Sequence, residues 1–161
     1  MDKIEIIKTE MNNLVSRMIN TFDIQIEESE GLYHVIIKTE EAPTIIGRHG
    51  ETIRAIQKIM EVILYKKLGE AVNILVNVND YREKQKERLE SLASQAAERA
   101  MSEQKPSYLR GFSSYERKII HEYITENYPD LTTSSIGEGK DRRLVINLKS
   151  NEQESKSEPE A

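Results

Sequence analysis

The chain has 161 residues, of which 37% are hydrophobic and 32% are charged. A soluble domain usually takes about 100 to 200 residues, so this length excludes a large multidomain enzyme and leaves room for one domain or two small ones. The absence of cysteine excludes disulfides, thiolate zinc sites and thiol nucleophiles. We expect no transmembrane segment and no secretion signal, and therefore a cytoplasmic protein, because no apolar stretch approaches the ~18 residues that span a bilayer.

The formal net charge of −5 argues against a polyanionic partner, but the charge is unevenly distributed. Residues 44–68 carry five basic and two acidic side chains, and residues 105–149 carry eight basic and six acidic ones. Because salt screens a charge beyond about 8 to 10 Å, two basic segments on an acidic background can attract a polyanion to chosen surfaces. The alternative is ordinary surface charge that only keeps the protein soluble.

The first part of the chain predicts a helix followed by a hairpin of two strands. Apolar residues spaced three and four apart predict the helix over residues 8–20. Alternating apolar and polar residues predict strands at 22–27 and 32–38, with a turn at 29–31.

Two further helices and a strand are predicted next. Pro43 opens a short helix through Ile46, and a Gly-x-x-Gly segment at 47–50 separates it from a second helix that ends near Leu68. A strand follows at 72–78. The apolar residues that keep the second helix in phase are Ile53, Ile56, Ile59, Met60, Ile63 and Leu64.

The second part of the chain begins with a predicted long helix over residues 80–103, roughly 35 Å in length, which contains no Gly or Pro. Its narrow apolar stripe consists of Leu89, Leu92, Ala93, Ala96, Ala97, Ala100 and Met101. Ser113 and Glu116 form a capping box that begins a helix to about Tyr128. Strands at 131–136 and 142–148 are joined by a turn.

The Gly-x-x-Gly segment is a candidate phosphate-binding loop. Glycines let another backbone approach closely, and the N-terminal amides of the following helix point toward the same place. Arg48 and His49 can donate to phosphate oxygens, and Ile45, Ile46 and Ile53 would form the floor of a groove for bases. Alone, the pattern is weak, because two glycines at this spacing often mark only a turn.

Arg117 and His121 form a second candidate site, because residues four apart share one helix face. Two basic groups there suit a bound anion, and the nearby turn adds Lys140, Arg142 and Arg143 as phosphate contacts. The alternative is structural: Arg117 pairs with a local acid, and His121 is a neutral, packed residue.

The order of elements around the loop, together with the stretch Ile45-Ile-Gly-Arg-His-Gly-Glu-Thr-Ile53, resembles a type II KH domain. That resemblance implies that Gly47, Arg48, His49 and Gly50 clamp the backbone of about four single-stranded nucleotides, with Ile46 lining the groove. The stretch Tyr115-Glu-Arg-Lys-Ile-Ile-His121, followed by a Gly-Glu-Gly turn and a basic strand, resembles the R-three-H domain, a single-stranded nucleic-acid-binding domain named for its Arg-x-x-x-His motif.

A KH domain, a helix that opens with Asp80-Tyr81-Arg82, and an R-three-H domain occur in this order in the bacterial Jag family, also called SpoIIIJ-associated or KhpB proteins. The resemblance implies an α+β fold with a KH domain at 1–79, a connecting helix at 80–104, an R-three-H domain at 105–149 and a disordered acidic tail at 150–161. The chain has no room for the N-terminal Jag domain that many members carry. Lys118 replaces a common arginine, and Leu109-Arg-Gly-Phe112 differs from the usual Leu-x-Pro-Met.

The expected function is therefore non-catalytic binding of single-stranded RNA, with single-stranded DNA as a further ligand, by a post-transcriptional regulator or RNA chaperone. The resemblance links this role to bacterial cell elongation and division, and to a small KH-domain partner or a homodimer. The expected RNA-binding residues are Ile46, Gly47, Arg48, His49, Gly50, Arg117, Lys118, His121, Arg142 and Arg143. No cofactor, metal or catalytic residue is expected. The alternative function is a protein-interaction adaptor whose nucleic-acid sites are vestigial.

Overall fold

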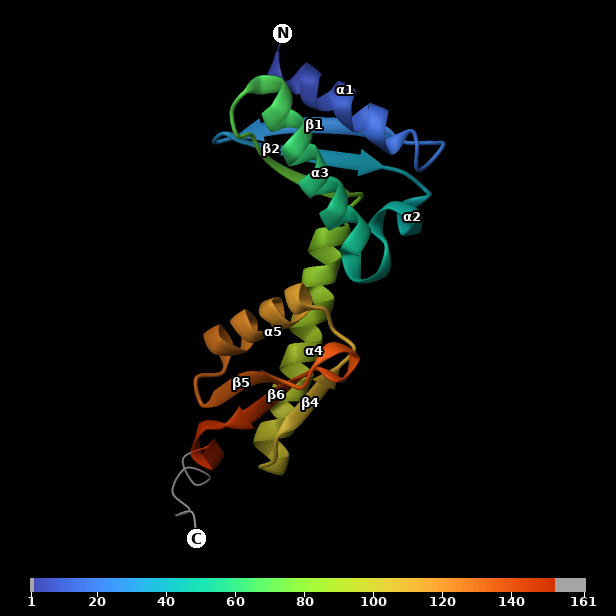
Figure 1. Cartoon of the computed structure of the whole chain (residues 1–161). Helices are drawn as coiled ribbons and strands as arrows, with labels where there is room; N and C mark the ends of the chain where they lie inside the picture. Colours follow the sequence, from blue (N-terminus) through green and yellow to red (C-terminus); the bar gives the residue numbers. More distant parts are fainter. Residues whose placement is uncertain (1, 153–161) are drawn as a thin grey trace. The chain divides into compact units, whose positions relative to one another are not determined.

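A computed structural model describes residues 2–152 of the chain (Figure 1). These residues form two compact units, with the boundary between Glu83 and Lys84, and each unit has its own apolar core. No helix in the described range is both long enough and apolar enough to cross a membrane. The fold is α+β, as predicted.

The first unit is a three-stranded sheet covered by helices. The sheet has the order β1-β2-β3, in which β1 and β2 are antiparallel and β2 and β3 are parallel. Its elements are α1 (Lys3–Val15), β1 (Asp23–Ser29), β2 (Leu32–Lys38), α2 (Ala42–Ile46), the 3-10 turn η1 (Arg48–Gly50), α3 (Glu51–Leu68) and β3 (Asn73–Val78). The hairpin, both helices after it and the last strand confirm the predicted order.

Helix α1 begins and ends earlier than predicted, at Lys3 and Val15 instead of at residues 8 and 20. Its start is fixed by Asp2, whose side chain accepts a hydrogen bond from the Ile4 amide (3.3 Å), as an N-cap residue does. The apolar spacing that predicted this helix also extends upstream, because Ile7 is fully buried.

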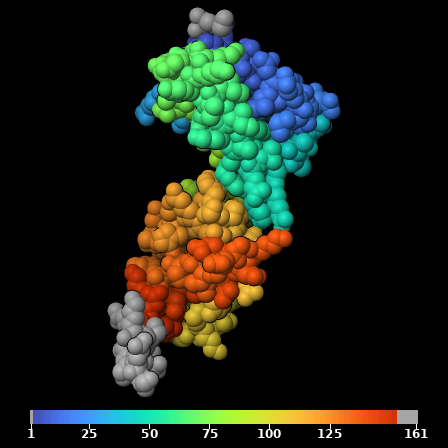
Figure 2. Space-filling view, in the orientation of Figure 1, coloured from blue at the N-terminus to red at the C-terminus, as the bar shows by residue number. Residues whose placement is uncertain are grey.

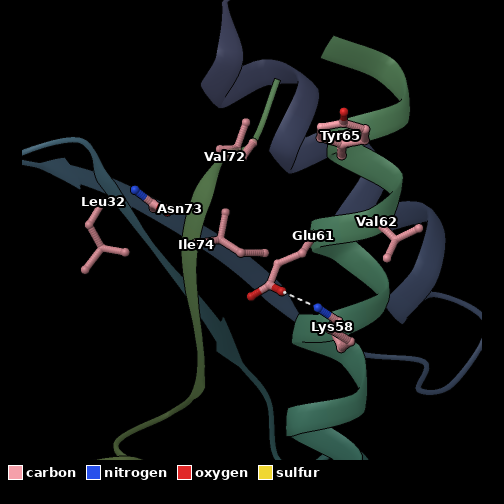
Figure 3. A pocket seen from close by; sticks show the side chains of 9 residues that line it. Leu32, Lys58, Glu61, Val62, Tyr65, Val72, Asn73 and Ile74 are labelled. Atoms are coloured by element: carbon pink, nitrogen blue, oxygen red, sulfur yellow. Dashed lines mark hydrogen bonds and ion pairs between the residues drawn. The ribbon is translucent and has the colours of Figure 1, made fainter. Parts of the chain in front are cut away.

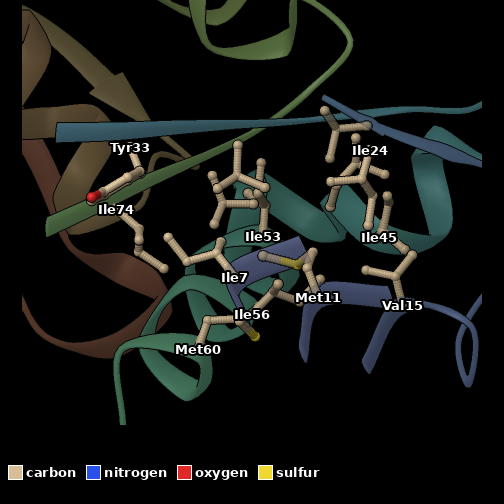
Figure 4. Packing of buried hydrophobic residues seen from close by; sticks show 14 of the residues in the cluster. Ile7, Met11, Val15, Ile24, Tyr33, Ile45, Ile53, Ile56, Met60 and Ile74 are labelled. Carbon is tan, nitrogen blue, oxygen red and sulfur yellow. The ribbon is translucent and has the colours of Figure 1, made fainter. Parts of the chain in front are cut away.

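Helices α1 and α3 contribute facing apolar side chains to the core of this unit (Figure 4). From α1 come Ile7 and Met11, and from α3 come Ile56 and Met60, all at most 2% exposed. Ile59, one of the apolar residues that keep the predicted helix in phase, lies outside the core, because its side chain is 47% exposed. At 100° per residue, Ile59 falls outside the arc that the buried α3 residues share.

The second unit contains most of α4 (Tyr81–Glu103), followed by β4 (Ser107–Arg110), α5 (Ser114–Asn127), β5 (Leu131–Ile136), the 3-10 turn η2 (Gly139–Asp141) and β6 (Arg143–Leu148). Its sheet has the order β4-β6-β5, and both strand pairs are antiparallel. Helices α4 and α5 pack against one face of this sheet through the inward residues Leu131, Leu144, Ile146 and Leu148.

The small-residue stripe of α4 forms part of this core, so the helix expected to connect two domains belongs largely to the second one. Leu89, Ala93, Ala97 and Ala100 are fully buried. Small side chains let β4 approach closely enough for the Ser107 hydroxyl to donate to the Ala96 carbonyl (3.0 Å). Within the predicted stripe Met101 is an exception, because it is 40% exposed.

The predicted capping box at the start of α5 is confirmed. The Ser113 hydroxyl accepts from the Glu116 amide (3.2 Å), and Glu116 Oε2 accepts from the Ser113 amide (2.8 Å). The Glu116 carboxylate is 1% exposed, and its other oxygen accepts from the Gln85 side chain (2.7 Å). This cap fixes where α5 begins and therefore which residues share its outer face.

The disordered tail predicted at the C-terminus was placed too early in the chain. Residues 149–152 are helical, so the predicted disordered tail does not start at residue 150. The rest of that predicted tail lies outside the described residues.

Candidate nucleic-acid interface

The Gly-x-x-Gly loop has a backbone that only certain residues adopt. Gly47 has φ +73° and ψ −177°, and Gly50 has φ +73° and ψ +18°, both in regions that favour glycine. His49 also has a positive φ, +54°. The Gly47 amide donates to the Pro43 carbonyl (3.1 Å), which ends α2 and directs the chain into the loop.

Contacts inside the unit restrict both glycines, Gly47 more than Gly50. A Cβ at Gly47 would lie 2.1 Å from Oγ1 of Thr52, and a Cβ at Gly50 would lie 3.0 Å from Oη of Tyr81 and 3.2 Å from Nη1 of Arg54. The usual reason given for such glycines is the approach of a ligand backbone. At Gly47 the fold alone already excludes a side chain, whereas at Gly50 the neighbouring side-chain ends can move.

The loop presents positive charge and backbone donors together. The Arg48 side chain is exposed, and His49 is half-buried. Arg54 Nη1 donates to the His49 carbonyl (2.8 Å) and so holds the loop against α3. No side chain caps the N-terminus of α3, but its first amide, that of Glu51, already donates to the Arg48 carbonyl. The exposed Arg48 side chain and the N-terminal end of α3 are the features that a phosphate would contact.

Arg54 and Tyr81 were missed by the sequence reasoning. The signal for Arg54 is its place one helical turn after Gly50, where a basic side chain can reach back to the loop carbonyls. Tyr81 had no local signal, because it reaches the loop through the tertiary fold from 31 residues downstream of Gly50.

The predicted apolar groove floor is only partly correct. Ile46 is half-buried and remains available to line a groove, but Ile45 is 0% exposed and Ile53 is 2% exposed. These two side chains belong to the apolar core, so they support the loop from beneath and offer no surface to a base.

Glu41, which precedes α2, links the segment that leads into the loop to the residues that precede β1. Its carboxylate accepts hydrogen bonds from the backbone amides of Thr21 and Asn20, both at 2.9 Å. These two donors favour the ionised form and lower the pKa of Glu41 below its ordinary value of 4.5.

The second predicted site is assembled in the second unit. Arg117, Lys118 and His121 from α5 and Arg142 from the end of the turn line one open hollow of about 430 Å³. The other lining residues are Ser114, Thr133, Ser134, Ser135 and Leu144. Among these described lining residues there is no carboxylate, so the hollow combines positive charge with hydroxyl groups. This is the chemistry that binds phosphate oxygens.

The two arginines and the histidine of this hollow have neutral partners, whereas Lys118 Nζ lies 3.9 Å from the carboxylate of Glu122, which does not line the hollow. Arg117 Nη1 donates to the Phe112 carbonyl (2.7 Å), and Arg142 Nη1 donates to the Gly137 carbonyl (2.9 Å). His121 is exposed, and its Nδ1 is hydrogen-bonded to the Thr133 hydroxyl. The structural alternative was wrong for this pair: Arg117 bonds to a carbonyl instead of an acid, and His121 is not packed in the core.

The hydroxyl groups on β5 were missed by the sequence reasoning. Their signal is the run Thr132-Thr133-Ser134-Ser135 within a predicted strand, which supplies little to a core. Thr133 and Ser135 alternate onto the α5 side of the sheet, where they complete the hollow.

Two predicted phosphate contacts do not join this site. Lys140 is exposed in η2 and does not line the hollow. Arg143 follows Arg142 directly, so its side chain points to the opposite face of the sheet, over the ring of Tyr108. Arg143 therefore does not line the hollow of Arg117, and its contact with RNA stays a prediction.

The first unit has a further hollow, of about 570 Å³, between α3 and the edge strand β3 (Figure 3). Val62 and Tyr65 of α3 and Leu32 and Ile74 of the sheet line it. Val62 is 59% exposed and Tyr65 is 60% exposed, so this side of α3 offers apolar surface to solvent, next to the ion pair of Lys58 and Glu61 (3.5 Å) that also lines the hollow.

Comparison with known proteins agrees with this geometry. Residues 4–76 match the KH domain of the KhpA/KhpB family, and residues 87–148 match the R-three-H domain. The protein named RNA-binding protein KhpB of Bacillus subtilis (strain 168) is 31% identical over 150 residues, which are 92% of this chain and 72% of the relative.

Proteins of the same name in Clostridium symbiosum and Lactiplantibacillus plantarum are each 30% identical over 129 residues. These alignments cover 79% and 80% of this chain but only 58% and 40% of the relatives. The chain thus spans most of the Bacillus relative and about half of the other two. With both domains present in the family's order, this chain belongs to the KhpB family.

Proposed function

We propose that this chain binds single-stranded RNA without catalysing a reaction. The observation that carries the proposal is the hollow on α5, where Arg117, Lys118, His121 and Arg142 meet hydroxyl groups with no carboxylate among the described lining residues. Such a surface contacts phosphates, and the names of the relatives point to RNA as the polyanion. Single-stranded DNA is the further ligand to compare.

The Gly-x-x-Gly loop is the second part of the proposed interface. Gly47, Arg48, His49 and Gly50 would hold the sugar-phosphate backbone through amides and basic side chains, and the half-buried Ile46 would contact a base. Double-stranded RNA would bind more weakly, because its bases are not available to such a groove.

The loop is tested by replacing Arg48 and His49 together with Asp and measuring the affinity for a labelled single-stranded RNA. The matched control replaces Lys8 and Arg17 with Asp, because both are exposed basic residues of the same unit that lie outside the proposed interface. We expect the loop variant to lose most binding and the control to lose little. Equal affinity of wild type and a folded loop variant would refute the loop's role.

The α5 site is tested through the salt dependence of binding. Each phosphate contact with a single strand contributes about −0.7 to the slope of log affinity against log salt. Replacing Arg117 and His121 with Ala should weaken binding and reduce that slope. An unchanged slope would show that this face is structural.

The exposed apolar side of α3 favours a second candidate function, contact with another KH domain. Ile59, Val62 and Tyr65 are each at least 47% exposed on one helix. The proposed occupant is a small KH protein or a second copy of this chain. Val62→Asp should abolish the complex in sedimentation measurements, whereas Lys8→Asp should preserve it. The proposed contact would be contradicted if the wild type were monomeric and did not bind a separate KH protein.

In the cell, we place the protein in the cytoplasm as a post-transcriptional regulator or RNA chaperone connected with cell elongation and division. This placement follows from the proposed RNA ligand and from family membership. The test is to crosslink RNA in living cells and to compare cell length in strains that carry the wild type or the Arg48→Asp, His49→Asp variant. If a loop variant that no longer crosslinks to RNA has cells of normal length, RNA binding by this protein is not what connects it with cell elongation.

A further inference from the structure

The sheet of the second unit has an outer face that the two helices do not cover. Residues Leu144, Ile146 and Leu148 of β6 point into the core, so the alternating residues between them point outward. We name this the outer sheet face. Strand register places on it Tyr108 and Arg110 of β4, Arg143, Val145 and Asn147 of β6, and Thr132, Ser134 and Ile136 of β5. Orange-red atoms of β5 and β6 lie at the surface in Figure 2.

The outer sheet face is positively charged. Its positions on the three strands carry two arginines and no acidic residue. Arg110 and Arg143 are direct cross-strand partners. Like charges opposite each other destabilise a sheet, and a bound anion would offset the repulsion between these two arginines. The Nε atom of Arg143 is buried and has no hydrogen-bond partner, which leaves a donor unsatisfied.

The same face exposes a ring suited to stacking. The Tyr108 side chain is 54% exposed, and the Arg143 guanidinium carbon lies 5.7 Å from its ring centroid, within the range of a cation–π contact. This contact holds the ring beside a positive charge. Ile136, the β5 partner of Arg143, is 39% exposed and extends the apolar area next to it.

We propose that the outer sheet face is a second nucleic-acid contact surface of this unit, with a base stacked on Tyr108 and the adjoining phosphates at Arg110 and Arg143. Exposed aromatic side chains on a sheet stack bases of single strands, and neighbouring arginines hold their phosphates. The surface lies on the face of the sheet opposite the α5 hollow, and of its residues only Ser134 also lines that hollow. The inference rests on the proposed binding of single-stranded RNA.

The test compares full-length variants in binding to a labelled single-stranded RNA. Tyr108→Leu removes the stacking ring and keeps apolar area, whereas Tyr108→Phe keeps the ring. A further control is Met101→Leu, at an exposed apolar position (40%) of the same unit that lies outside both surfaces. We expect Tyr108→Leu to weaken binding about 5- to 100-fold, and Tyr108→Phe and Met101→Leu to stay within about twofold of wild type.

Charge at the face is tested separately by Arg110→Gln, an exposed position whose replacement leaves the core intact. The variant should reduce the salt slope by about 0.7. The inference would be overturned if Tyr108→Leu and Arg110→Gln both kept the wild-type affinity and the wild-type slope of log affinity against log salt. The proposed function would still hold in that case if the double variant Arg117→Ala, His121→Ala lost affinity. Failure of the wild type to bind any single strand would overturn both.

Discussion

Replacing Gly47 with alanine is expected to destabilise the first unit strongly, whether or not RNA is present. The backbone at φ +73° and ψ −177° lies in a region that is essentially restricted to glycine, which costs another residue about 1–3 kcal/mol. The new Cβ would lie 2.1 Å from Oγ1 and 3.0 Å from the backbone nitrogen of Thr52. Such overpacking adds about 1–3 kcal/mol, for a total of about 2–6 kcal/mol.

Two other glycines separate the contributions of strain and contact. Gly69 has φ +74° and ψ +5° with open space around it, so Gly69→Ala should cost only the left-handed penalty of about 1–2 kcal/mol. Gly50 has nearly the same backbone, but its Cβ would meet the Tyr81 hydroxyl at 3.0 Å. Because a side-chain end can move, Gly50→Ala should fall between the other two variants.

The assay is hydrogen exchange of the α3 amides in the full chain. Global unfolding by denaturant would mix the two units, and a single free energy would not describe them. Exchange by opening of the first unit reports on that unit alone. If Gly47→Ala costs no more than Gly69→Ala, the claim that Thr52 and the backbone dictate glycine at 47 is refuted. If the claim holds, only Arg48 and His49 are suitable positions for testing RNA contact.

Three further predictions concern stability. Glu116→Ala should destabilise the second unit by about 2–4 kcal/mol, because the capping amide and the Gln85 side chain both lose a buried, charged acceptor; α5 amides that exchange as slowly as in wild type would contradict this. The lowered pKa of Glu41 means that its stabilising contribution is present above its unfolded pKa and lost as the pH falls through its folded pKa. Glu41→Gln should therefore lose less stability than wild type as the pH is lowered from above the ordinary pKa of 4.5, and parallel pH profiles of hydrogen exchange in the first unit would refute it. Leu89→Ala should lower the opening free energy of the second unit by about 2–5 kcal/mol in hydrogen exchange, against about 0.5 kcal/mol or less for the exposed Met101→Ala, and similar losses would contradict the assigned core.

Most of the element order was predictable because local signals agreed with the tertiary fold. The two-residue turn at Glu30-Gly31, both with positive φ, joins strands whose alternation was visible in sequence. The capping box at Ser113 was also a purely local signal. The start of α1 was not found, because its signal was a single capping carboxylate at Asp2 and not a change in apolar spacing.

Less of the interface was predictable, because its details depend on which face of an element each residue occupies. The charge of the turn predicted Arg142 and Arg143 equally as phosphate contacts of one site. Neighbouring residues along a strand, however, point to opposite faces of the sheet. Arg142 therefore lines the α5 hollow, while Arg143 lies over Tyr108. Spacing along α3 could not separate Ile56, which is buried, from Ile59, which is exposed, because both fit an apolar helical pattern.

The most direct measurement is fluorescence anisotropy of the full chain with labelled single-stranded and double-stranded RNA over a range of salt concentrations. The account predicts binding at micromolar concentration or tighter to the single strand, weaker binding to the duplex, and a steep loss of affinity with salt. It also predicts loss of most binding when Arg48 and His49 are both replaced by Asp. The account would be contradicted if the affinity were the same for single-stranded and double-stranded RNA and did not change with salt, or if the folded protein bound no RNA.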